Sequence, residues 1–319
     1  MDPLLIAARA LHFAGALSLL GVLGFAVFVA REPPQIRQQL RVAAQLSAAL
    51  MLITAPLWLV LVAEDMGSDT LAGALSGGAP KTALLHTQFG HALCLRFILT
   101  VVLVPLVARL GEHRWRDGVA FVIAAVSVAA IAWQGHAGDE LGRDAMVHLT
   151  ADATHLLAAG LWLGALLPLM LLLRDVGEAS RKHDAAARFS TLGLICVAAL
   201  LASGIVNTYY LVGSVPALVG TAYGQMLLLK LVLVLTMLGL ATINRWQLVP
   251  RLAARGGDAA RRIALHSATE VALGLGVIAI VAMLGTMEPA MHEPIAWPFG
   301  SVPSNRSAPE MPAGHLHQE

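Results

Sequence analysis

Eight long apolar runs, separated by short polar segments, constrain this chain more than any other feature of its sequence. A helix needs about 20 apolar residues to cross the hydrocarbon core of a membrane. The runs lie at about 4–30, 42–63, 89–110, 118–134, 147–173, 189–212, 224–246 and 266–286. Only 13% of the residues are charged, whereas a soluble domain carries about 25%. We therefore expect an all-α fold, a polytopic membrane bundle of about eight transmembrane helices.

The loops between these runs differ in charge, which predicts the side of the membrane on which each lies. Arginine and lysine gather in every second loop, at 31–41, 109–117, 174–188 and 245–262. The only lysine or arginine residues in the alternate loops are Lys81 and Arg143. Loops rich in positive charge stay on the cytoplasmic side. The sequence thus predicts a multi-pass protein of the bacterial inner membrane, with both termini in the periplasm.

Two stretches from the start of the chain recur in its second half. ALHFAGALSLLG, from residue 10, aligns without gaps with ATHLLAAGLWLG, from residue 153, and this alignment pairs His12 with His155. TQFGHALCLRFIL, from residue 87, aligns with TAYGQMLLLKLVL, from residue 221, and pairs Arg96 with Lys230. The first and third helices therefore resemble the fifth and seventh. This pattern predicts two parallel four-helix repeats related by an axis along the membrane normal.

The repeat also predicts how the chain divides. We expect a first four-helix half at 1–134, a second at 135–286 and an external tail at 287–319. The tail is rich in proline and polar residues, a composition typical of segments without regular structure. It contains methionine and histidine side chains, namely Met287, Met291, His292, Met311, His315 and His317.

Ionisable side chains inside spanning helices are costly and usually mark a pathway or a site. His12, His91 and His155 each lie in the first turns of a helix that begins outside, which places them in the outer third of the bilayer at a rise of about 1.5 Å per residue. Asp152 lies one turn before His155 and shares its face of the helix. Such a carboxylate either orients a ligating histidine or binds the metal itself.

The sequence therefore predicts a metal site reached from outside and formed by His12, His91, Asp152 and His155. If the first and fifth helices turn His12 and His155 inward, the two imidazoles approach each other near the axis of the repeat. The alternative for each histidine is a hydrogen bond that joins two helices.

Histidine together with methionine favours copper. Imidazole suits zinc, copper, iron and nickel, whereas thioether sulfur selects Cu(I). The predicted outer segments and the tail contain several methionines, and neither Cys94 nor Cys196 belongs to a CxxC motif. We expect a copper ion, Cu(I) or Cu(II), in an oxidising compartment.

Several stretches of the chain resemble the bacterial copper-resistance D family (CopD/PcoD). They are HLLAAGLWLGALLPL, RFSTLGLICVAALLASGIVNTYYLVGS, YGQMLLLKLVLVLTMLGLATINRWQLVPRL and HEPIAWPFG. The resemblance covers nearly the whole chain, most specifically residues 147–300. It implies an inner-membrane protein of eight spans that serves copper homeostasis and resistance and moves copper from the periplasm to the cytoplasm. It also implies a small periplasmic copper-binding partner, CopC, which we expect as a separate protein because the chain shows no such β-domain.

We expect copper uptake rather than an enzymatic reaction, with membrane lipid around the chain and neither ATP nor nucleic acid as a partner. No GxxxxGK[ST] phosphate loop is present, so transport has to follow a gradient of copper or charge. One alternative is a membrane cytochrome that holds haem b between histidines and passes electrons to quinone or Cu(II). Another is a copper sensor or scaffold that binds the metal without moving it.

Overall fold

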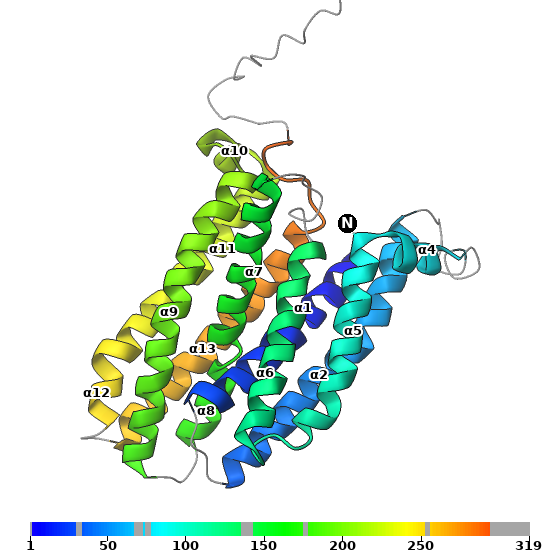
Figure 1. The fold of residues 1–319 in the computed structure, drawn as a ribbon. Helices are drawn as coiled ribbons and strands as arrows, with labels where there is room; N and C mark the ends of the chain where they lie inside the picture. Colours follow the sequence, from blue (N-terminus) through cyan, green and yellow to red (C-terminus); the bar gives the residue numbers. More distant parts are fainter. Residues whose placement is uncertain are drawn as a thin grey trace, which may run out of the picture.

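The computed structural model of the chain describes residues 2–29, 34–66, 73, 78–134, 143–174, 178–252 and 256–293. All of the regular structure in these residues is helical. Eight helical segments among them are long and apolar enough to cross a membrane. The prediction of an all-α polytopic membrane bundle is therefore confirmed, and Figure 1 shows the long helices packed side by side. Most of the predicted tail, including Met311, His315 and His317, lies outside the described residues.

The helices follow one another along the chain in two series. The first series is α1 (Pro3–Gly24) with the π-helix η1 (Phe25–Val29), α2 (Pro34–Asp65), α4 (Ala79–His86), α5 (Gln88–Val107), and α6 (Arg114–Ala129) with the 3-10 helix η2 (Ala130–Gln134). The second series is α7 (Arg143–Leu163), α8 (Leu166–Arg174), α9 (Ala179–Leu211), α10 (Val215–Gly220), α11 (Ala222–Ile243), the π-helix η4 (Asn244–Leu248), α12 (Val249–Leu252) and α13 (Gly256–Leu284).

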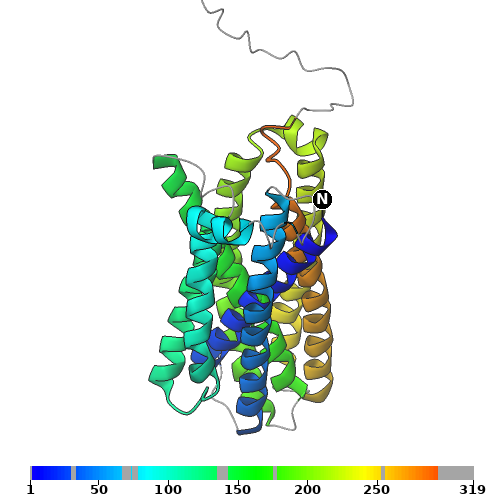
Figure 2. The ribbon, with the colours of Figure 1, turned by 90° about the vertical axis from the view of Figure 1, so that its right-hand side faces the viewer.

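The N-terminus and the segment that follows α13 lie at the same end of the bundle, which we call the outer end (Figures 1 and 2). The start of α2, the end of α8 and α12 lie at the opposite end (Figure 1). Most arginines of the predicted basic loops lie in the helix turns at this end, such as Arg37 of α2 and Arg251 of α12, because the helices continue beyond the apolar runs. The charge pattern along the sequence therefore corresponds to the two ends of the folded bundle.

The third and seventh spans begin in the same way, as the sequence repeat predicts. Each follows a short helix, α4 or α10, and each is capped by a threonine. Thr87 accepts a hydrogen bond from the Gly90 N–H at 3.0 Å, and Thr221 accepts one from the Gly224 N–H at 3.0 Å. A Cβ atom at either glycine would collide with the backbone of the preceding short helix. These matching turns correspond to the aligned stretches of the sequence, and the division of the chain into two halves stays a prediction.

The helices α1 and α7 meet at two glycines that the repeat makes equivalent. A Cβ atom at Gly21 would collide with the backbone of Gly164, and one at Gly164 would collide with the carbonyl oxygen of Leu17. Small residues at such a crossing let helix backbones touch, which is how helices associate where the surrounding lipid is as apolar as their side chains. If a twofold axis relates the two predicted repeats, it exchanges Gly21 and Gly164. Because these two residues touch, they then lie beside that axis.

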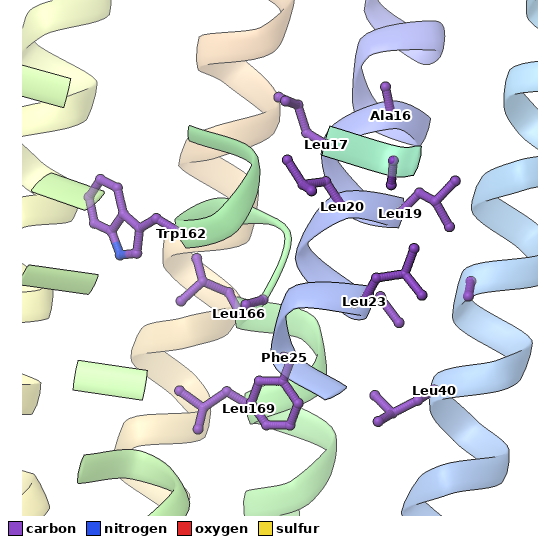
Figure 3. Close-up of a cluster of buried hydrophobic side chains, with 14 of the residues drawn as sticks. Ala16, Leu17, Leu19, Leu20, Leu23, Phe25, Leu40, Trp162, Leu166 and Leu169 are labelled. Atoms are coloured by element: carbon purple, nitrogen blue, oxygen red, sulfur yellow. The ribbon is translucent and has the colours of Figure 1, made fainter. Parts of the chain in front are cut away.

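The core of the bundle surrounds this crossing. Figure 3 shows leucine side chains of α1 packed next to Leu166 and Leu169 of α8. In the most apolar window of the first span 72% of the residues are buried, against 6% in the seventh, so α1 is central and α11 is peripheral. Large apolar side chains on the outside, such as Ile205 and Leu235, are mostly exposed, as expected of a surface that faces lipid.

Candidate functional site

In the outer half of the second series, polar side chains of α7 face polar side chains of α9. His155 Nδ1 lies 3.1 Å from Ser203 Oγ. Asn207 Nδ2 donates a hydrogen bond to Asp152 Oδ1 at 3.3 Å. The two contacts lie one helical turn apart because both pairs of residues are spaced by three or four positions. Asp152 and His155 therefore share one face of α7, as the sequence predicts, and that face is turned towards α9.

A third contact continues this arrangement one turn further out. The rings of His148 and Tyr210 stack with their centroids 4.8 Å apart and their planes at 7°. His148 is 2% exposed, so it belongs to the interior of the bundle. The sequence analysis did not include it in the site. The spacing of His148, Asp152 and His155 would have revealed it, since side chains four and then three residues apart form one stripe on a helix.

The hydrogen bonds around Ser203 fix the tautomer of His155. The Ser203 hydroxyl donates its single proton to the carbonyl oxygen of Ala199 at 2.6 Å. Ser203 Oγ must therefore accept from His155 Nδ1–H. The lone pair of the neutral imidazole is then on Nε2, through which a histidine can bind a metal.

Two groups on α11 act on the Asp152 carboxylate. Lys230 lies within Coulombic range of both Asp152 and His155. Tyr223, two turns before Lys230, is also close enough to interact with the charge of Asp152. A cation from a third helix therefore acts on the Asp152 carboxylate.

The segment after α13 covers the outer end of these helices. The Glu293 carboxylate accepts hydrogen bonds from the backbone N–H groups of Ala222 at 3.2 Å and Tyr223 at 3.3 Å, which caps α11. Met226 and Met287 pack against the small apolar cluster that contains Tyr223. Thioether side chains thus lie near the outer end of the second series, close to a residue that interacts with Asp152.

His12 makes the equivalent contact in the first series. Its Nδ1 lies 2.8 Å from Thr54 Oγ1 on α2, and the Thr54 hydroxyl donates to the Leu50 carbonyl oxygen at 2.7 Å. His12 therefore donates from Nδ1, as His155 does. Its Nε2 is buried without a hydrogen-bond partner, and the side chain is 1% exposed. Its ring packs against Trp58 with the centroids 5.4 Å apart.

Two guanidinium groups lie near the His12–Trp58 pair, and the Arg9 group also donates to the Gly285 carbonyl oxygen at 2.7 Å. Arg9, one turn earlier on α1, places its guanidinium carbon 5.5 Å from the centroid of the Trp58 ring. Arg96 of α5 lies within Coulombic range of His12 and donates to Gln134 Oε1 at 2.6 Å. The surroundings of His12 are therefore cationic, whereas those of His155 include an acid.

The four predicted ligands are thus distributed over three places. Asp152 and His155 lie together, His12 is turned towards α2, and His91 is exposed with its Nε2 2.9 Å from the carbonyl oxygen of Leu85. In the described part of the chain, no three His, Cys, Asp or Glu side chains are grouped so that they could hold a metal ion. A single copper site that joins all four residues stays a prediction.

These features define a class of protein: a polytopic membrane bundle with imidazole and charged side chains inside its outer half. Comparison with known families gives the particular family. Residues 1–147 match the model of the copper resistance protein D-like N-terminal domain, and residues 183–284 match that of copper resistance protein D. The chain belongs to the copper resistance protein D family, so it is a copper-handling membrane protein and the predicted resemblance is confirmed.

Three relatives illustrate the family. The chain is 33% identical to inner membrane protein YebZ of Escherichia coli (strain K12), over 89% of this chain and 98% of the relative. It is 30% identical to copper resistance protein D of Pseudomonas syringae pv. tomato, over 91% of this chain and 98% of that protein. It is 34% identical to copper transport protein CutJ of Bacillus subtilis (strain 168), over 53% of this chain and 30% of that protein. No solved structure matches the chain.

Proposed function

We propose that this chain takes up copper across the bacterial inner membrane, and that Asp152 and His155 bind copper inside the bundle. The observation that carries the proposal is the face that α7 turns to α9. There a carboxylate lies one turn from an imidazole whose Nε2 holds the lone pair. His148, on the same stripe, is the third side chain that we assign to this copper path.

The chemistry of these groups fits copper as the substrate. Imidazole is a good ligand for copper, and thioether sulfur selects Cu(I). Met226 and Met287 lie at the outer end of the same helices, where an arriving ion would meet them first. The family to which the chain belongs and the relatives named for copper resistance and copper transport support the same metal.

The distribution of basic residues between the two ends of the bundle supports movement of copper from the periplasm to the cytoplasm. We assign the arginine-rich end of the bundle to the cytoplasm and both termini to the periplasm, because basic loops stay inside. Asp152 and His155 then face the periplasmic half, where we expect a separate CopC-like protein to deliver copper. A membrane potential that is negative inside contributes about 2.3 kcal/mol per unit charge per 100 mV, which drives a cation inward without ATP.

The two repeats have separate roles in this proposal. We take 1–134 and 135–286 as two four-helix halves and 287–319 as an external tail, on the basis of the matching caps and the Gly21–Gly164 contact. The copper path belongs to the second half. His91 is exposed near the outer end of the first half, and we leave His12 out of the path because the Arg96 cation lies within Coulombic range of it.

Copper accumulation in cells tests the proposal. Cells without their own copper uptake would express the parent chain, His155→Ala, Asp152→Asn or His183→Ala, with equal amounts of protein in the membrane. His183 is the control, since it is a partly exposed histidine near the start of α9. We expect both site variants to lose most of the accumulated copper and the control to keep it. If His155→Ala accumulates as much copper as the parent, the proposed copper site at Asp152 and His155 is wrong.

Two further measurements on the purified chain address the alternative functions. Copper content and an absorption spectrum, taken before and after dithionite, separate copper from haem. A Soret band that shifts on reduction would make the chain a cytochrome. Copper flux into sealed vesicles separates a transporter from a sensor or scaffold, because those two bind the metal without moving it.

A further inference from the structure

The first half contains a second polar site that matches the copper path position by position but carries opposite charge. His12 and His155 are paired by the repeat, and each hydrogen-bonds to a hydroxyl of the next span. One turn away on each helix, the chemistry differs. The equivalent pairs, with the first half named first, are Arg9 and Asp152, His12 and His155, Thr54 and Ser203, Trp58 and Asn207, and Arg96 and Lys230.

The replacement of the acid by Arg9 changes what the first site can bind. Where the second half has one carboxylate and one ammonium group, the first half has two guanidinium groups, Arg9 and Arg96. Among the residues that the structure describes, neither forms an ion pair. Two cations at this place repel a metal ion and attract an anion.

The same site presents four buried hydrogen-bond donors without partners beside one unpaired acceptor, His12 Nε2. Arg96 is 0% exposed, and its Nε and Nη2 atoms have no hydrogen-bond partner. Trp58 Nε1 and Arg9 Nε are also buried without one. Donors that stay unsatisfied inside a membrane are costly, because no bulk water is available there. Four unpaired donors against one unpaired acceptor indicate that a further acceptor belongs with them.

These donors come from α1, α2 and α5, and the Arg9 guanidinium also donates from Nη1 to the Gly285 carbonyl oxygen at 2.7 Å. The Trp58 ring lies 5.4 Å from the His12 ring and 5.5 Å from the guanidinium carbon of Arg9. Arg96 lies within Coulombic range of His12 and is held by Gln134 through Nη1 alone. The Nε–Nη2 edge of Arg96 therefore remains available. That edge carries two parallel N–H groups whose spacing matches the two oxygens of a carboxylate.

We propose that the first half binds a small carboxylate anion, held by the Nε–Nη2 edge of Arg96 and by Trp58 Nε1–H, with Arg9 as the second positive charge. The two halves then have opposite preferences, an anion in the first and a metal cation in the second. This inference goes beyond the proposed copper path and does not depend on it, since it concerns different residues and a different ligand.

Sodium formate is the probe, because it is the smallest carboxylate. The purified full chain in detergent is titrated with formate or with chloride at equal ionic strength, and unfolding temperature and tryptophan fluorescence are recorded. We expect a saturable rise in unfolding temperature with formate that exceeds the effect of chloride, and a fluorescence change that Trp58→Phe removes. Arg41→Gln is the control, because Arg41 binds Leu110 and Glu112 in another part of the fold.

Two variants of Arg96 separate charge from geometry. Arg96→Gln should abolish the response to formate, and Arg96→Lys, which keeps the charge without the paired N–H groups, should weaken it about tenfold. If Arg96→Gln does not fold, the comparison of the formate responses of the parent and Trp58→Phe chains tests the proposal. A formate effect no larger than that of chloride, or one that Arg96→Gln retains, overturns the proposal and leaves only water at the site.

Discussion

Removal of the Ser203 hydroxyl gives a sharp test of the copper path, since Ser203 acts only through His155. Ser203→Ala deletes the acceptor that lies 3.1 Å from His155 Nδ1 and leaves the ring otherwise in place. The imidazole is then free to rotate and to exchange tautomers, so Nε2 no longer always presents its lone pair. Loss of such a supporting hydrogen bond typically weakens metal binding about 10–100-fold, or about 1.4–2.8 kcal/mol.

The repeat supplies a matched control. Thr54→Ala removes the equivalent hydroxyl from His12, 2.8 Å away, in the half that we assign to an anion. Copper affinity, measured by competition with a chelator on the purified chain, should fall in Ser203→Ala and stay at the parent value in Thr54→Ala. Equal affinities in Ser203→Ala and the parent would refute the role of His155. Equal losses in both variants would instead favour one copper site shared by His12 and His155.

Two other substitutions test the charge balance and the helix crossing. Lys230→Met should tighten copper binding, on the order of tenfold in the same competition assay, because it removes a cation within Coulombic range of Asp152; an unchanged affinity would contradict this. Gly21→Val should lower the unfolding temperature, since its Cβ atom would collide with the backbone of Gly164 and overpacking typically costs about 1–3 kcal/mol. Gly118→Ala is the control because nothing lies near its Cβ position, and a similar loss in both variants would contradict the expected contact.

The number of spans and the shared face of Asp152 and His155 could be predicted from the sequence alone. Length and apolar composition determine the first, and the spacing of three residues on a helix determines the second. The hydroxyl and amide partners on α9, Ser203 and Asn207, could not be predicted in this way. The contact between α7 and α9 depends on how each helix is rotated about its axis, which local periodicity in an almost uniformly apolar span does not determine.

The direction of His12 could have been read from the aligned repeat. Gly21 and Gly164 are paired in it, and paired glycines indicate close approach of two backbones. His12 precedes Gly21 by nine residues, which is two and a half helical turns. A glycine that faces the partner helix therefore places the histidine on the opposite side. The structure agrees, since His12 contacts Thr54 and Trp58 of α2.

The glycine contact between α1 and α7 also bears on the origin of the molecule. Two identical subunits that associate about a twofold axis bring each axial residue against its own copy. Gly21 against Gly164 has this form within one polypeptide. A homodimer has to change both copies of a residue at once, whereas a fused duplicate can change them one at a time. Joining the subunits would thus have allowed an arginine to arise at residue 9 while its counterpart, Asp152, remained an acid.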